Sequence, residues 1–175
     1  MRSSLCAWLV VGALLSAAAA QTSGAKAASG GNSADETAIR ALEHNFAEAV
    51  KAKDLDKIMS SYEHGQNLVV FDVVPPREYV GWDAYKADWQ KVLGTFSGAV
   101  TFEISGLEVT AVGNLAYGYS FQHVAGKTTN GNTMDVTVRV TDVYRKSGGK
   151  WLIVHEHVSV PVDLDSGKAD LQSKQ

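Results

Sequence analysis

The chain has 175 residues, a length that suits one domain with a single hydrophobic core. It carries 16 lysines and arginines against 19 aspartates and glutamates, a formal net charge of −3. This acidic balance, without a basic stripe, disfavours nucleic-acid binding.

The first twenty residues have the three parts of a secretory signal peptide. Arg2 supplies the positive start, residues 5–15 form an apolar run, and residues 17–20 are all alanine, the small residues that a signal peptidase requires. The apolar run is too short to remain as a membrane anchor. A cytosolic protein with a buried first helix is the alternative. We expect residues 1–20 to be a signal peptide, and the mature protein to be periplasmic or secreted without membrane attachment.

Cys6 is the only cysteine of the chain and lies inside this signal. Cleavage after residue 20 leaves a mature chain without cysteine. The mature protein therefore needs no disulfide, and thiolate or redox chemistry at cysteine is excluded.

Residues 21–33 are rich in serine, glycine and alanine and predict a flexible linker. Folded structure is expected from residue 34, behind a capping box that starts at Ser33. Apolar residues then recur at helical spacing to about Lys53, and Asp54 caps a second, shorter helix.

A short β-branched run over residues 68–72 predicts a strand, which Pro75 and Pro76 stop. Asp83 then caps a third helix, which ends at Gly94. These residues therefore predict one short strand between the second and third helices.

The spacing of apolar residues then changes from helical to alternating. Four long strands are predicted, separated by polar or glycine-rich turns: residues 100–112, 115–125, 132–146 and 150–160. Helices followed by antiparallel strands predict an α+β fold, a curved antiparallel sheet packed on three N-terminal helices. Because a long twisted sheet curls, we expect a cone with an internal pocket. The folded domain is expected over residues 34–162, and residues 163–175 are expected to form a disordered tail.

Four short segments carry a family resemblance: KDLDKI at residues 53–58, GWDAY at 81–85, DVYRKSGGKW at 142–151 and VHEHVS at 154–159. In this order, over roughly residues 35–160, they resemble the SnoaL-like and ketosteroid-isomerase-like superfamily, also called nuclear-transport-factor-like. The last segment also resembles the final strand of the association domain of calcium/calmodulin-dependent kinase II. This superfamily includes isomerases, cyclases, dehydratases and non-catalytic binders, so the fold alone does not name the chemistry.

The resemblance implies two candidate catalytic residues. In steroid isomerases of this fold, an aspartate on the first strand moves the proton, while a tyrosine and a protonated aspartate hold the enolate oxygen. Asp72 falls at the position of the proton-moving aspartate, and Asp142 at that of the protonated one. Phe46 stands where those enzymes have the tyrosine, which argues against steroid isomerisation itself. Tyr62 faces the same cavity in this alignment and can supply another hydroxyl.

Strand alternation extends the predicted ligand-binding site. Tyr119, Phe121 and His123 are expected to point inward from the second long strand, and Glu156 from the last one. His123 is then either a general acid or base near the mouth, or a histidine hydrogen-bonded to the loop at residues 126–131.

The three carboxyl groups of Asp72, Asp142 and Glu156 are expected to share one largely apolar space. They cannot all stay ionised there at low cost, so at least one should have a raised pKa and hold a proton at neutral pH. A base beside a proton-holding donor is what proton abstraction next to a carbonyl requires. The alternative is that these acids face solvent or pair with arginines.

Phe46 and Trp89 are expected to provide flat apolar walls of the cavity. His155 and His157 should project from the opposite face of the last strand, where members of the superfamily commonly pack against a second subunit. A metal site would need a third protein ligand. We therefore expect a homodimer contact through the outer sheet face, and no metal or cofactor.

Two hypotheses for function follow, and they rank nearly level. The first is a cofactor-independent isomerase or dehydratase-type enzyme that transfers a proton on a small apolar carbonyl compound. The second is a non-catalytic module that binds a small-molecule ligand or forms homo-oligomers.

Overall fold

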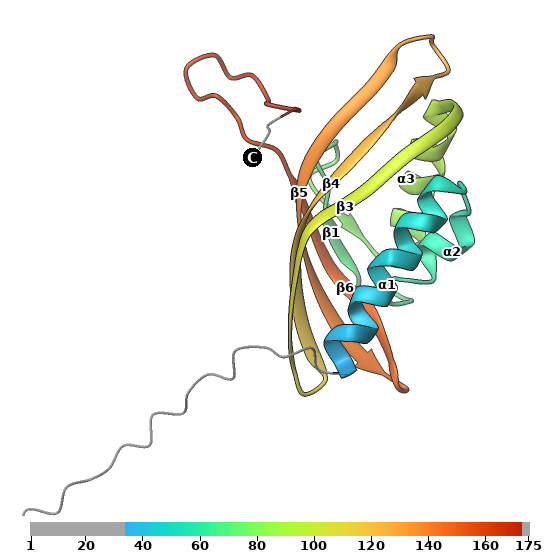
Figure 1. Cartoon of the computed structure of the whole chain (residues 1–175), viewed down its shortest axis with the longest axis vertical. Coiled ribbons are helices and arrows are strands. Elements are labelled where there is room, and N and C mark those ends of the chain that lie inside the picture. The colour runs from blue at the N-terminus through green and yellow to red at the C-terminus, as the bar shows by residue number, and fades with distance from the viewer. Residues whose placement is uncertain (1–33, 173–175) are drawn as a thin grey trace, which may run out of the picture.

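The computed structural model describes residues 34–172, which form three helices and six strands (Figure 1). The predicted signal peptide and linker lie outside the described residues. In chain order the elements are α1 (Ala34–Lys51), α2 (Leu55–Met59), β1 (Val69–Phe71), β2 (Tyr79–Val80), α3 (Trp82–Thr95), β3 (Phe96–Val112), β4 (Leu115–Thr128), β5 (Thr133–Ser147) and β6 (Lys150–Ser159).

The first helix is amphipathic, with acidic residues in its first turn and one buried stripe. Ile39, Phe46 and Val50 on this stripe are at most 2% exposed. The helix ends at Lys51, and the chain turns through Lys53, whose φ of 54° is left-handed. Asp54 then caps α2 by accepting a hydrogen bond from the Lys57 backbone N–H at 3.1 Å. The predicted boundary between the two helices is therefore confirmed to within two residues.

The strands form one sheet in the order β2-β1-β6-β5-β4-β3. All pairs are antiparallel except β1 and β6, which run parallel. The α+β class and the helix-backed curved sheet are confirmed, whereas the sheet is mixed rather than wholly antiparallel. Its parallel pair arises because β1, from the N-terminal half of the chain, lies beside the last strand, β6.

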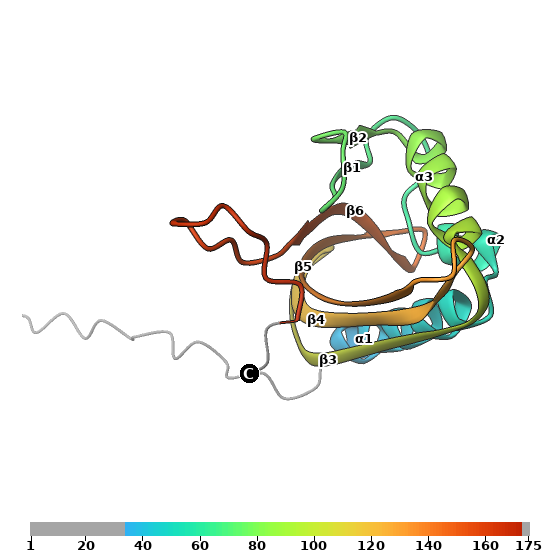
Figure 2. The same ribbon diagram turned by 90° about the horizontal axis from the view of Figure 1, so that it is seen from above.

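The sheet curves around the helices, which all lie on its concave side (Figures 1 and 2). Register shifts interrupt the β3–β4 pair at two places. One further shift makes Val154 the extra residue of β6, because Val143 pairs with His155 and Tyr144 with Ile153. Such bulges increase bending and twist, which explains how these long strands can curl.

Residues 161–172 follow β6 and fold back as a small hairpin, at the end where the chain leaves the sheet (Figure 2). Val162 pairs with Ala169, and the Leu171 carbonyl accepts a hydrogen bond from the Thr137 backbone N–H at 2.8 Å. The tail expected from residue 163 therefore has hydrogen-bonded structure to residue 172. No helix within residues 34–172 is long and apolar enough to cross a membrane.

Candidate functional site

An interior cavity of about 390 Å³ opens between α3, the sheet and the C-terminal hairpin. Most of its wall is apolar, and four side chains that can ionise lie among the lining residues: Asp72, Tyr85, Asp88 and Glu156. Val124, Val136, Val138 and Val158 line it from the sheet, and Ala169 and Leu171 from the hairpin. A largely apolar hollow with a few convergent polar groups is the usual form of a small-molecule site.

Asp72 lies at this wall because it directly follows β1, whose parallel pairing with β6 brings it toward Glu156. One carboxylate oxygen accepts a hydrogen bond from the Val73 backbone N–H at 2.5 Å. The other lies 3.4 Å from the Tyr85 hydroxyl. Burial raises the pKa of the Asp72 carboxyl, and the nearby charge of Asp88 adds to this.

Glu156 is the cavity acid that binds two tyrosine hydroxyls. Its two oxygens accept hydrogen bonds from the Tyr62 hydroxyl at 2.8 Å and from the Tyr85 hydroxyl at 2.5 Å. Burial raises the pKa of Glu156 to about 7, although both tyrosine hydroxyls lower it. Burial therefore favours the protonated form of this carboxyl.

Asp142 lies behind Glu156 and not at the cavity wall. The two residues are direct partners across β5 and β6, and Asp142 is 2% exposed. Burial raises the pKa of Asp142 well above its usual range, and the charges of Glu43 and Glu156 add to this. One of its oxygens has no hydrogen-bond partner among residues 34–172, an arrangement that costs less for a neutral acid than for a carboxylate.

Glu43 is a further buried acid, which the sequence analysis missed. It is 2% exposed and accepts a hydrogen bond from the Tyr144 hydroxyl at 2.8 Å. Burial raises the pKa of Glu43 to about 7. A signal for it exists in the sequence, because Glu43 lies four residues after Ile39 and three before Phe46, on the apolar stripe of α1.

These buried acids have no cationic partner within residues 34–172. Within the described part of the chain, no ion pair involves Glu43, Asp142 or Glu156, and no group of acids, histidines or cysteines is arranged to hold a metal ion. The cluster therefore reaches low charge by binding protons.

Tyr79 and Asp88 add a polar contact that was also not foreseen. The Tyr79 hydroxyl donates to the Asp88 carboxylate at 2.7 Å, and Asp88 lines the cavity. The adjacent Trp89 also lines the cavity, as predicted, and its ring nitrogen has no partner among residues 34–172. A ligand that accepts a hydrogen bond would suit this indole N–H.

Phe46 and Tyr62 are buried one layer behind the cavity wall. Phe46 packs edge-to-face on Trp89, with 5.6 Å between ring centres, and on Tyr62 at 6.0 Å. Neither residue lines the cavity, so each contacts a ligand only through its neighbours. The Tyr62 hydroxyl, bonded to Glu156, orients that carboxyl instead.

The predicted inward direction of Tyr119, Phe121 and His123 is wrong. Their neighbours Ser120 and Gln122 are buried on the inner face, whereas Tyr119 is 52% exposed. His123 pairs with Asp135 at 2.9 Å on the outer face.

The alternation of β4 was thus assigned one residue out of phase. One inner position, Gly118, lies directly against the Tyr144 side chain. A Cβ atom at Gly118 would lie 3.1 Å from the Tyr144 hydroxyl oxygen.

His155 and His157 occupy the face opposite to Glu156, as alternation predicts. The His155 ring nitrogen Nδ1 lies 2.8 Å from the Val69 carbonyl oxygen, and both imidazoles contact the Phe71 ring edge-to-face. This pair therefore belongs to the outer surface of the sheet.

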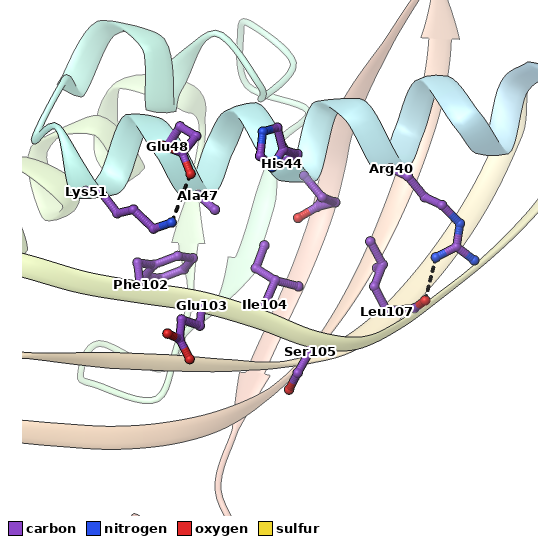
Figure 3. Close-up of a pocket in the computed structure, with 11 residues that line it drawn as sticks. Arg40, His44, Ala47, Glu48, Lys51, Phe102, Glu103, Ile104, Ser105 and Leu107 are labelled. Carbon is purple, nitrogen blue, oxygen red and sulfur yellow. Dashed lines mark hydrogen bonds and ion pairs between the residues drawn. The ribbon is translucent and has the colours of Figure 1, made fainter.

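A second hollow of about 430 Å³, the α1–β3 groove, lies between α1 and β3 (Figure 3). Charged side chains of α1 border it: Arg40 donates to the Leu107 carbonyl at 2.6 Å, and Lys51 pairs with Glu48 at 2.9 Å. Glu43 also lines this groove. The groove and the interior cavity thus lie on opposite sides of the buried acids.

A family profile described as "SnoaL-like domain" matches residues 39–163. This match covers most of the chain, so the protein belongs to the SnoaL-like domain family, as its sequence motifs predicted.

Solved structures agree with this assignment. An NTF2-like protein of unknown function from Pseudomonas putida KT2440 is 31% identical, with a TM-score of 0.73, and the match covers 81% of this chain and 97% of that one. A protein from Novosphingobium aromaticivorans DSM 12444 with the provisional name scytalone dehydratase is similar in fold, at 15% identity, a TM-score of 0.66 and coverage of 81% and 89%.

A third similar structure comes from Xanthomonas campestris and is provisionally named a calcium/calmodulin-dependent protein kinase II association domain. It shares 22% identity and a TM-score of 0.60, over 69% of this chain and 84% of that one. A search of curated proteins finds no match to the chain.

Proposed function

We propose that this protein is a cofactor-independent enzyme that transfers a proton on a small, largely apolar carbonyl compound, by isomerisation or dehydration. One observation carries the proposal: Asp72 and Glu156 share the wall of an apolar cavity and are bridged by the Tyr85 hydroxyl. A relative by fold with the provisional name of a dehydratase supports this class of reaction.

The two acids suit two different roles. Asp72 is the more exposed of them and is the candidate base that removes a proton from the carbon next to the carbonyl. Glu156, with its pKa of about 7, is the candidate donor to the carbonyl oxygen as negative charge develops there. The proton on Asp72 then returns to another carbon of the substrate, or assists the departure of a hydroxyl group as water.

This assignment changes the role expected for Asp142. The sequence paired it with Asp72 at the cavity wall, whereas Glu156 separates it from the cavity. Asp142 instead acts on the site through Glu156, its direct partner across β5 and β6.

Exchange of carbon-bound protons into solvent tests the proposal. With 2-tetralone as the probe in deuterated buffer, NMR should show enzyme-dependent deuterium uptake beside the carbonyl. Asp72→Asn should lower that rate by about 10²-fold or more, the usual contribution of a general base. The matched control Asp83→Asn changes an exposed aspartate of α3 and should leave the rate unchanged.

The competing function is non-catalytic binding in the same cavity, which its apolar wall also supports. Native mass spectrometry that finds a co-purifying ligand, together with equal exchange rates in the wild type and Asp72→Asn, would favour binding over catalysis.

We further infer a homodimer through the outer sheet face. Tyr117 and Tyr119 are 49% and 52% exposed on this face, and large exposed aromatic side chains are enriched at interfaces. Light scattering after size exclusion should give twice the chain mass, and Tyr119→Lys should lower it. An unchanged monomer mass in both proteins would contradict the dimer.

Export to the periplasm or exterior is likewise our proposal, supported by the pattern of residues 1–20. Mass spectrometry of the protein from its native host should find an N-terminus at residue 21.

A further inference from the structure

Two cavities approach the same buried acids from opposite sides. Glu43 lines the α1–β3 groove, and Asp72 lines the interior cavity. Between them stands a line of carboxyl and hydroxyl groups, here called the acid relay, in the order Glu43, Tyr144, Asp142, Glu156, Tyr85 and Asp72. Hydrogen bonds join its members on each side, and the central step joins Asp142 and Glu156, which are paired across β5 and β6.

On the groove side of the acid relay, Tyr144 connects Glu43 to Asp142. Its hydroxyl oxygen lies 2.8 Å from Glu43 Oε1 and 3.4 Å from Asp142 Oδ2. A tyrosine hydroxyl has one proton to donate, so it can bond to both acids only if one of them is protonated and donates in turn. The geometry therefore favours one acidic proton shared between the Glu43 and Asp142 carboxyl groups, in addition to the proton of the Tyr144 hydroxyl.

The cavity side repeats this arrangement around Tyr85. Its hydroxyl oxygen lies 2.5 Å from Glu156 Oε1 and 3.4 Å from Asp72 Oδ2. The hydroxyl can therefore bond to both acids only if one of the two carboxyl groups is protonated. Asp142 and Glu156 link the two halves, because they are direct partners on neighbouring strands. Each tyrosine can thus accept a proton from one acid while it donates its own to the other.

We propose that the acid relay carries protons between the α1–β3 groove and the interior cavity, with Glu43 as its solvent-side end. This inference rests on the proposed function for its use in turnover, but the path itself is a property of the folded protein.

One outward transfer moves one proton in total. Asp142 gives its proton to the Tyr144 oxygen while the Tyr144 hydroxyl proton passes to the Glu43 carboxylate, which then releases it to water in the groove. Glu156 reprotonates Asp142, and Tyr85 repeats the exchange with Asp72. Burial raises the pKa of both tyrosines well above 10, so each hydroxyl must accept and donate in one step without becoming a tyrosinate.

The two ends of the acid relay differ in polarity, so a path between them can carry a proton from an apolar cavity to a polar groove. The interior cavity is mostly apolar, and an occupying ligand would separate Asp72 and Glu156 from water. The α1–β3 groove is bordered by the charged side chains of Arg40, Glu48 and Lys51 (Figure 3), and charged groups of this kind favour contact with water. A base that becomes protonated under a bound substrate can therefore lose its proton through Glu43.

Infrared spectroscopy can test the path without a substrate. The carbonyl stretch of a buried, protonated carboxyl group shifts when its proton is replaced by deuterium, so rapid mixing with D₂O gives the rate of exchange. The background protein carries both Asp72→Asn and Glu156→Gln, because these two acids of the relay line the interior cavity. The signal followed is that of Asp142, which lines neither hollow. In this background Glu43→Gln should slow exchange by about tenfold or more. Glu48→Gln, a second glutamate of the same groove, should not.

Equal exchange rates in the Glu43→Gln and Glu48→Gln proteins would overturn the acid relay. If Glu43→Gln does not fold, Tyr144→Phe removes the adjoining hydroxyl in an isosteric side chain and must slow exchange in the same way. The proposed enzyme function can fail separately: wild-type protein that never exchanges 2-tetralone protons contradicts catalysis, whereas the infrared rates still decide the acid relay.

Discussion

The buried and the exposed acids of this protein differ in the direction of their pKa shifts. Burial raises the pKa of three acids enclosed between the helices and the sheet: Glu43, Asp142 and Glu156. Lysine partners lower the pKa of three acids at the surface: Asp35, Glu48 and Asp54. The same type of side chain is thus stabilised as the neutral acid inside the cone and as the charged carboxylate at the surface. Within residues 34–172, the lysines that pair with these acids lie at the surface.

The aromatic residues should show the largest difference between inside and outside. Phe46 is 2% exposed and packs edge-to-face on three rings, so Phe46→Ala should lower the free energy of unfolding by about 3–5 kcal/mol. Tyr119→Ala on the exposed face should change it by only about 0.5 kcal/mol in the monomer. Urea unfolding of dilute protein measures both, and a similar loss in the two variants would contradict the assigned faces.

The buried acids should also give the protein an unusual dependence on pH. Their folded-state pKa is raised, so the native protein binds more protons than the unfolded chain, and this stabilisation is lost as the pH rises. For Glu156 the window runs from its usual value near 4.5 to about 7. We expect the free energy of unfolding to fall by an amount on the order of 2 kcal/mol between pH 5 and pH 8.

Two variants sharpen this pH prediction. Glu156→Gln should flatten the dependence, because the neutral amide cannot lose a proton, whereas Glu48→Gln should keep it. Urea unfolding at several pH values measures the slope. Stability that rises from pH 5 to pH 8 in the wild-type protein would show that the inner acids are not proton-bound.

The surface acids should give the smallest effect, with the opposite sign. Asp35 bonds to the Lys146 ammonium at 2.5 Å and to the Trp151 indole at 3.0 Å, and the lysine holds its pKa low. The contribution of Asp35 to the free energy of unfolding is therefore fully present above the pKa of this group in the unfolded chain. It is lost as the pH falls through the lower pKa of the folded protein. Asp35→Asn should shift the unfolding midpoint less than Phe46→Ala or Glu156→Gln, since partly exposed ion pairs are well solvated. A larger shift than that of Glu156→Gln would contradict this order.

Much of the fold could be predicted from local patterns. The helical spacing before residue 95, the alternation after it and the caps at Asp54 and the glycine turns depend on neighbours in the chain. The two-residue strand β2 was missed because so short a segment has no period to detect. The parallel pairing of β1 with β6 joins segments more than 80 residues apart, and nothing local encodes it.

The candidate site was predicted less completely than the fold. Asp72, Trp89 and Glu156 line the cavity as expected, while Asp142 stands behind it. The predicted inward direction of Tyr119 was wrong. Alternation shows which residues of a strand share a face but not which face points inward, and the aromatic content of β4 favoured the wrong choice. Packing of Tyr144 against Gly118 decides that phase, and no property of β4 alone reveals it.

The sequence by itself determined the order of the elements, the family motifs and the supply of acids and aromatic rings, because these depend on composition and short-range spacing. Tertiary structure decided which acids lose contact with water and which tyrosine hydroxyls reach them. That choice sets their protonation, since desolvation acts on a carboxyl group only after distant strands and helices have closed around it.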